Sequence, residues 1–273
     1  MRSDIWGEKV VVRKLHFAYE MEIEYSIPAS RCHFTIKCVP KDTNRQKISD
    51  YKIGIKPDTS LSYGRDGLGN VQIYGVNTDA HDSFVFSISG NALTGLADYE
   101  TDADEQTDII FAHPHGLNVA GDRIVEFYNA NKPDQSMSVL EQIYELMHAL
   151  HRAFAYEPYT TDVNTSAEEA MAQGYGVCQD FAHIFIAFMH LLGLPARYVT
   201  GLIVGEGASH AWVEVLVDGK WYGVDPTNDS AVGDEHIRIG IGRDARDCTI
   251  NRGIMRGGGL HIQTIRVNVD EEQ

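Results

Sequence analysis

The chain has 273 residues, of which 43% are hydrophobic and 23% are charged, a balance typical of a folded protein with one large domain or two ordinary ones. Its net charge of −16 would repel a phosphate backbone or an anionic bilayer, so we expect neither nucleic acid nor a membrane as a partner. Four scattered cysteines exclude a disulfide framework. With no run typical of a signal peptide or a membrane span, these features predict a soluble, cytoplasmic protein.

The first part of the chain, residues 9–95, is typical of a series of short β-strands. Segments such as RKLHFAYEMEIEYSI and SFVFSISG concentrate β-forming residues, and GRDGLGN and NTDAHD supply turns between strands. Such a series predicts an antiparallel β-sandwich. Because the following segment LADYETDADEQTD is acidic and aperiodic, we predict a sandwich domain over residues 1–105 and a second domain over 106–273.

Two amphipathic helices are predicted next. Leucine, isoleucine, tyrosine and methionine recur at helical spacing over residues 138–154, and Ser138 with Glu141 forms a capping box. A shorter helix follows in TSAEEAMAQG, where Ser166 and Glu169 form a second capping box and Gly174 marks the end.

A third helix, residues 179–192, is apolar on nearly every face and ends at Gly193, so we expect it to be buried on all sides. Cys178 stands at its head. Free N–H groups and the positive end of the helix dipole stabilise a thiolate in a first turn, and the same N–H groups can hold a developing oxyanion. The position of Cys178 alone is also compatible with a purely structural role, which is the role we expect for Cys32, Cys38 and Cys248.

The segment SHAWVEVLVDGKWYGVDPTN, residues 209–228, predicts a hairpin around Asp218 and Gly219. If those two residues form the loop, Asp225 lies opposite Trp212 and diagonal to His210, within hydrogen-bond reach of its ring. A carboxylate beside an imidazole holds a general base in one tautomer. The chain therefore offers a candidate nucleophile on a helix and an oriented histidine on a hairpin, although periodicity cannot show that they meet.

These motifs resemble the transglutaminase-like superfamily. The resemblance rests on Gly-x-Cys opening a helix, Gly-Leu-Pro-Ala-Arg at its exit, His-Ala-Trp-Val-Glu on a strand and Trp before Asp-Pro on the next, within residues 138–228. The first hundred residues look like the N-terminal region of bacterial members, and residues 240–273 look like their C-terminal tail, which we expect to return and pack on the rest.

The resemblance implies an α+β fold in which a papain-like core, with its helix packed on an antiparallel sheet, follows the sandwich. It implies Cys178 as nucleophile, His210 as general base and then acid, and Asp225 as the residue that orients His210. The substrate implied is a peptide or protein amide, cleaved through an acyl-enzyme as in a cysteine protease. Transamidation with an amine acceptor is the alternative reaction, and a scaffold without catalysis is the alternative of another class.

Further site residues are less clearly marked. We expect an oxyanion donor or substrate contact from Gln173, Tyr175 or Trp212, although each has an ordinary structural interpretation as a helix-end or packing residue. Eukaryotic transglutaminases need calcium, but no loop of closely spaced acidic ligands is present here. We therefore expect no metal and no cofactor, and the oligomeric state stays open.

Overall fold

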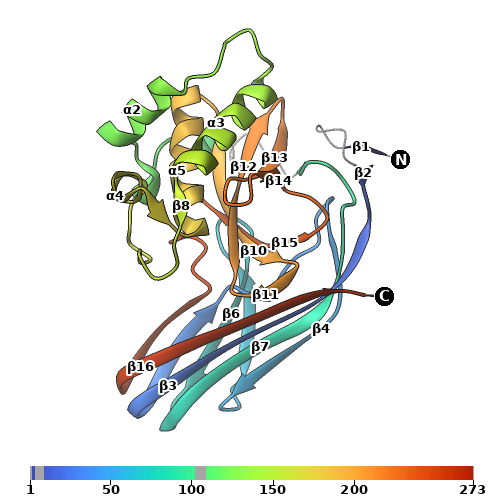
Figure 1. The fold of residues 1–273 in the computed structure, drawn as a ribbon. Coiled ribbons are helices and arrows are strands. Elements are labelled where there is room, and N and C mark those ends of the chain that lie inside the picture. Colours follow the sequence, from blue (N-terminus) through green and yellow to red (C-terminus); the bar gives the residue numbers. More distant parts are fainter. Residues whose placement is uncertain (1, 4–8, 102–108, 273) are drawn as a thin grey trace.

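The fold was analysed in a computed structural model that describes residues 2–3, 9–101 and 109–272. It contains two main antiparallel sheets and a group of helices (Figure 1). The helical elements are η1 (Gly116–Asn118), α2 (Asp122–Ala130), α3 (Val139–Ala153), α4 (Ala167–Gln173) and α5 (Cys178–Leu192). No helix in the described ranges is long and apolar enough to cross a membrane.

The larger sheet has seven strands and is made mostly from the N-terminal region. Its centre is the long strand β3, which pairs with β7 along its first half, with β6 along its last residues, and with β16 over most of its length. The strands of this sheet are β3 (Arg13–Ile36), β4 (Lys47–Lys56), β5 (Leu61–Arg65), β6 (Val71–Asn77), β7 (His81–Thr94), β11 (Gly205–Gly207) and β16 (Asn251–Glu271).

The expected sandwich over residues 1–105 is not confirmed. Strands β3 to β7 of that region join one sheet, and β16 from the far end of the chain and β11 complete it. The alternation of apolar residues in β3 fits this arrangement, because Leu15, Phe17 and Tyr19 are buried on one face. The predicted boundary between residues 105 and 106 lies outside the described residues, and the division into two domains stays a prediction.

The smaller sheet has five strands in the order β14, β13, β12, β10, β15. These are β10 (Ala196–Ile203), β12 (His210–Val217), β13 (Lys220–Asp225), β14 (Ser230–Ala231) and β15 (His236–Gly242). The remaining short strands form two separate pairs, β1 (Arg2–Ser3) with β2 (Lys9–Val10) and β8 (Ala155–Tyr156) with β9 (Tyr175–Gly176).

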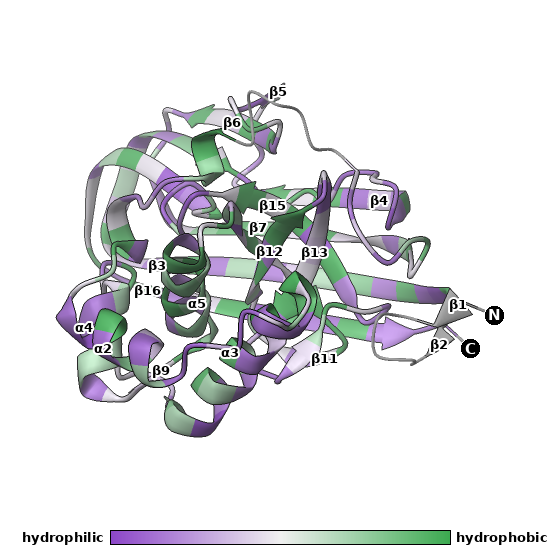
Figure 2. Ribbon diagram, turned by 90° about the horizontal axis from the view of Figure 1, so that it is seen from above, coloured by the Kyte–Doolittle hydropathy of each residue, from purple (hydrophilic) through white to green (hydrophobic). Residues whose placement is uncertain are grey.

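The smaller sheet lies between the helices and the larger sheet. On one face, Val213, Val215 and Val224 share an apolar core with α5. On the other, Leu202 and Ile237 share a core with residues of β3 and β7. Figure 2 shows α5 as predominantly hydrophobic, which fits the expectation that it is buried on all sides. The order of layers is therefore helices, five-stranded sheet, seven-stranded sheet.

The three predicted helices are confirmed close to their expected ends. Ser138 caps α3 and Ser166 caps α4, each within a complete capping box. Gly174 and Gly193 end α4 and α5 in the left-handed region, with φ of 82° and 83°. Helix α2 was missed, because its sequence lies in the stretch of weak periodicity before residue 135.

Candidate active site

Cys178 is the first residue of α5, so its backbone N–H belongs to the first turn, whose N–H groups lack intrahelical acceptors. It is half-buried, whereas the other three cysteines are buried. The turn that carries it is held by Asp180, whose Oδ2 accepts hydrogen bonds from the Val177 backbone N–H at 2.8 Å and from Thr161 Oγ1 at 2.7 Å. Asp180 therefore caps the start of the helix. The thiol is therefore the accessible one, on a fixed turn.

Gly176 is needed for this turn. A Cβ at this position would lie 2.5 Å from Asp180 Oδ2, closer than real Cβ atoms approach a neighbour. Gly176 lets the Asp180 carboxylate reach the backbone N–H before Cys178.

The hairpin that carries His210 has the predicted register. Val217 pairs with Lys220 and Val213 with Val224, so Asp218 and Gly219 form a two-residue loop. Both loop residues have positive φ, 49° and 73°, as such a tight turn requires.

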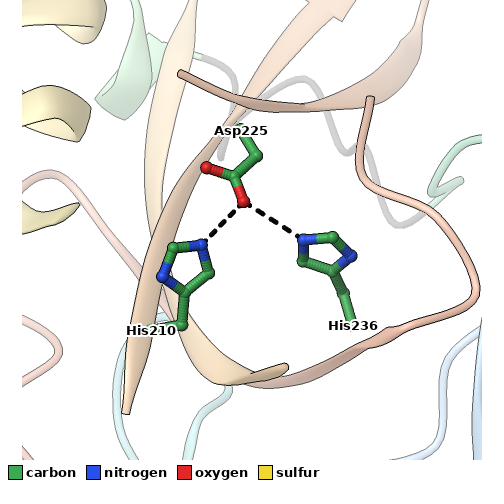
Figure 3. Close-up of side chains that lie close together, drawn as sticks. All are labelled: His210, Asp225 and His236. Atoms are coloured by element: carbon green, nitrogen blue, oxygen red, sulfur yellow. Dashed lines mark hydrogen bonds and ion pairs between the residues drawn. The ribbon is translucent and has the colours of Figure 1, made fainter. Parts of the chain in front are cut away.

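His210 and Asp225 form a buried hydrogen-bonded pair. The Nε2 atom of His210 lies 2.7 Å from Asp225 Oδ2, as Figure 3 shows, and the two residues are 9% and 0% exposed. The other carboxylate oxygen, Oδ1, accepts the backbone N–H groups of Thr227 at 3.1 Å and Asn228 at 3.2 Å. These bonds fix the carboxylate, and through it the plane of the His210 ring.

The charged forms of both groups are favoured. Burial lowers the pKa of His210, but hydrogen bonds with Asp225 and Cys178 and the charges of both groups outweigh it and raise this pKa to about 10. Burial raises the pKa of Asp225, but hydrogen bonds and charge from His210 and His236 outweigh it and lower that pKa strongly. Since Nε2 of His210 faces Asp225, its Nδ1 is the atom left for the sulfur of Cys178. The structure thus brings the three predicted residues together.

His236 is a fourth member of this cluster, and sequence reasoning missed it. Its Nε2 lies 3.3 Å from Asp225 Oδ2, and its Nδ1 accepts the Gly233 N–H at 3.3 Å. Because Nδ1 accepts, Nε2 must carry the hydrogen and donate it to Asp225. Burial lowers the pKa of His236, which keeps it neutral. No sequence signal marks it, because it reaches the site from β15, a strand joined to the rest of the sheet through β10.

The same cluster could be taken for a metal site, since His210, Asp225 and His236 bring three ligand atoms within 4.8 Å of one another. Ligand atoms at about 2.0 Å from a tetrahedral zinc lie about 3.3 Å apart. The 2.7 Å separation of His210 Nε2 and Asp225 Oδ2 is shorter and matches a hydrogen bond. The rings of His210 and His236 both direct Nε2 at the same oxygen, Asp225 Oδ2. Two hydrogen-bond donors on one acceptor explain this arrangement better than three ligands around a metal ion. That no metal is needed stays a prediction.

The three weaker candidates, Gln173, Tyr175 and Trp212, differ in exposure. Gln173 is the exposed last residue of α4, and its side chain makes no hydrogen bond within the described part of the chain. Tyr175 is half-buried in β9. Trp212 is 1% exposed, and its ring packs 6.1 Å from the His210 ring and 5.2 Å from the His236 ring. It therefore packs beside the histidines instead of lining an open cleft.

A buried ion pair links the hairpin to the neighbouring strand β10. Arg197, from Gly-Leu-Pro-Ala-Arg, places its guanidinium 2.6 Å from the carboxylate of Glu214, from His-Ala-Trp-Val-Glu. The same carboxylate lies 3.2 Å from Arg238, and the Arg197 guanidinium stacks 4.2 Å from the centre of the Trp221 ring. These charges join β10 to β12, which carries His210, and to β15, which carries His236.

Comparison with known proteins gives two family matches. Residues 127–226 match the transglutaminase-like superfamily, and residues 15–92 match the bacterial transglutaminase-like N-terminal region. Among curated proteins, an uncharacterized protein of Mycobacterium leprae is 41% identical over 114 residues, 38% of this chain and 40% of that protein. The match thus spans less than half of that relative. An uncharacterized protein of Mycobacterium tuberculosis is 28% identical over 252 residues, 79% of each chain.

Among solved structures, a protein of Cytophaga hutchinsonii described as a candidate cysteine protease has the same fold. The TM-score is 0.80 at 20% identity, over 96% of this chain and 92% of that one. This likeness covers both sheets and the helices.

Proposed function

Because this chain belongs to the transglutaminase-like superfamily, we propose that it is an enzyme that transfers acyl groups from amides through Cys178. The observation that carries the proposal is the position of His210, which forms hydrogen bonds with both Cys178 and Asp225. We infer that the preferred reaction is hydrolysis of an amide bond in a peptide or protein.

In the acylation step, the Cys178 sulfur attacks the substrate carbonyl carbon and forms a C–S bond. A protonated His210 beside the sulfur favours the thiolate. Negative charge develops on the carbonyl oxygen, where the backbone N–H groups at the start of α5 are placed to donate. Collapse of this intermediate breaks the C–N bond, and the proton on His210 Nδ1 goes to the leaving amine. The product is a thioester on Cys178.

In the deacylation step, neutral His210 accepts a proton from water through Nδ1 as the water oxygen attacks the thioester carbonyl. The C–S bond breaks, the acid leaves, and the proton remains on His210. Asp225 stays ionised throughout and stabilises the imidazolium, while its bond to Nε2 keeps Nδ1 directed at the sulfur. Asn228 and His236, which donate to the same carboxylate, hold it in place.

Two alternative functions are transamidation, which would use the same site, and a scaffold role, which would not use it. If an amine attacks the thioester in place of water, the product is a new amide and the enzyme is a transamidase. A scaffold without catalysis would have no use for a hydrogen-bonded imidazole and carboxylate beside an accessible thiol.

The experiment is a turnover assay with a casein digest as amide substrate, with and without the fluorescent primary amine dansylcadaverine. New N-termini without amine incorporation are expected, and Cys178→Ala and His210→Ala should each abolish them. Cys32→Ala, which removes a buried thiol, is the matched control and should retain activity. Incorporation of the amine would instead favour transamidation. Full activity in folded Cys178→Ala would contradict the proposal.

A further inference from the structure

A cavity of about 590 Å³ lies beside the candidate active site. Gln179, which follows Cys178, and Ser209, which precedes His210, both line it. Its wall also includes Tyr198, a buried residue of β10, and β10 pairs with β12, the strand that begins at His210. The cavity is therefore within reach of a substrate whose carbonyl lies at Cys178.

Among the residues that the structure describes, the charged ones that line this cavity are two arginines, Arg246 and Arg252, and no aspartate or glutamate. The rest of its lining is apolar or neutral and polar, for example Asn251 and Gln263. This is unexpected in a chain that has 39 acidic and 23 basic side chains and a net charge of −16. The net negative charge of the protein repels an anion in solution, whereas the two arginines of the cavity attract it.

The acidic residues nearest in sequence form no ion pair with these arginines. Asp247 is paired with Arg243, at 2.8 and 3.1 Å. Asp244 is fully buried and accepts backbone N–H groups, including that of Arg246 at 2.9 Å. Within the described ranges, neither Arg246 nor Arg252 has an ion-pair partner.

Arg252 is also held in place before any ligand arrives. Its Nη2 donates to the backbone carbonyl of Arg246 and, at 3.3 Å, to Thr249 Oγ1. Its backbone is fixed as well, because Arg252 pairs with Thr35 in the larger sheet. A guanidinium that is already oriented loses less freedom on binding, and its other N–H groups suit a carboxylate.

We propose that this cavity is a subsite for a carboxylate of the acyl substrate, bound by Arg246 and Arg252. The inference rests on the proposed function, since it assigns the substrate class to the same site. The substrate is then an acidic peptide, whose carboxylate lies close to the reacting amide. The carboxylate can belong to the C-terminus of the peptide or to an aspartate or glutamate side chain.

The first test compares alkylation of Cys178 by iodoacetate, an anion, with alkylation by the neutral iodoacetamide, by mass spectrometry at low salt. The ratio of the two rates reports attraction of the carboxylate, because the reactivity of the thiol itself cancels. Losing two cations in Arg246→Gln/Arg252→Gln should lower the ratio by about threefold or more. Arg123→Gln, an exposed arginine on α2 that does not line the cavity, should leave the ratio unchanged.

An equal ratio in the wild type and the double variant would overturn the carboxylate subsite. That failure is distinct from failure of the proposed function, which would appear as slow alkylation of Cys178 by both reagents in the wild type.

The second test distinguishes the two sources of carboxylate. Three fluorescein-labelled pentapeptides are titrated into Cys178→Ala, which cannot turn them over, and binding is followed by anisotropy. One has a free C-terminus and a central glutamine, one an amidated C-terminus and a central glutamate, and one an amidated C-terminus and a central glutamine. Tightest binding of the first indicates a terminal carboxylate, and of the second an acidic side chain. No preference over the third would overturn the proposal.

Discussion

Asp225→Asn should lower the pKa of His210, because the asparagine removes the charge that favours the imidazolium. The rise of that pKa from 6.5 to about 10 corresponds to roughly 5 kcal/mol of preference for the charged ring, at about 1.4 kcal/mol for each factor of ten. Asp225 and Cys178 share this effect. Because burial opposes them, losing the share of Asp225 should bring the His210 pKa clearly below its wild-type value.

The assay is an NMR titration of the histidine rings, with Asp229→Asn as the matched control. Asp229 lies four residues further along and contacts a different histidine, His148, at 2.5 Å. In that control the His210 titration should stay as in the wild type. A His210 titration in Asp225→Asn that equals the wild type would refute the reasoning that the hydrogen-bonded carboxylate sets the charge of the imidazole.

The same shift makes stability depend on pH. The folded-state pKa of His210 is raised above the unfolded value, so its contribution is fully present below about pH 6.5 and is lost as pH rises through about 10. Urea denaturation of the wild type should therefore show falling stability across this window, and Asp225→Asn should show a smaller fall. A fall of the same size in both proteins would contradict the assignment of this dependence to the pair.

Three further predictions concern neighbouring residues. Glu214→Ala removes the carboxylate that Arg197 and Arg238 share, so it should lower the free energy of unfolding in urea by about 3–5 kcal/mol, and a loss below about 1 kcal/mol would contradict this role. His236→Phe should lower kcat about tenfold with little change in KM and should shift the pH profile, whereas His236→Gln, which can still donate, should retain most activity; equal losses in both would argue for packing alone. Gly176→Ala should slow iodoacetamide alkylation of Cys178, because its Cβ would strike Asp180. Gly67→Ala, where a Cβ meets open space, is the control, and equal rates in both would exclude a role for this turn.

Local chemistry made the site residues predictable. The capping boxes at Ser138 and Ser166 are short-range patterns, and so is the Asp218–Gly219 loop, which fixes the hairpin register. Once that register is known, the approach of Asp225 to His210 follows from strand geometry. Cys178 at the head of α5 followed from the start of the apolar run 179–192 and the glycines before it. Its meeting with His210 did not follow, because that depends on how α5 packs on β12.

The remaining features depend on contacts between distant parts of the chain. The pairing of β16 with β3 joins residues more than two hundred positions apart, and no sequence periodicity indicates which strand becomes the neighbour of another. His236 reaches Asp225 for the same reason, through the order of strands in the smaller sheet. The arginines of the cavity, Arg246 and Arg252, lie before and at the start of β16, and no local pattern indicated that they would line a cavity beside Cys178.

The most direct test of the central claim is the intact mass of the protein after brief incubation with p-nitrophenyl acetate, an activated acyl donor. The account predicts a burst of p-nitrophenol and one acetyl group that peptide mapping places on Cys178. The group should be absent in Cys178→Ala and should form more slowly in His210→Ala. Acetylation to the same extent in Cys178→Ala, or on other residues of the wild type alone, would contradict a nucleophilic Cys178.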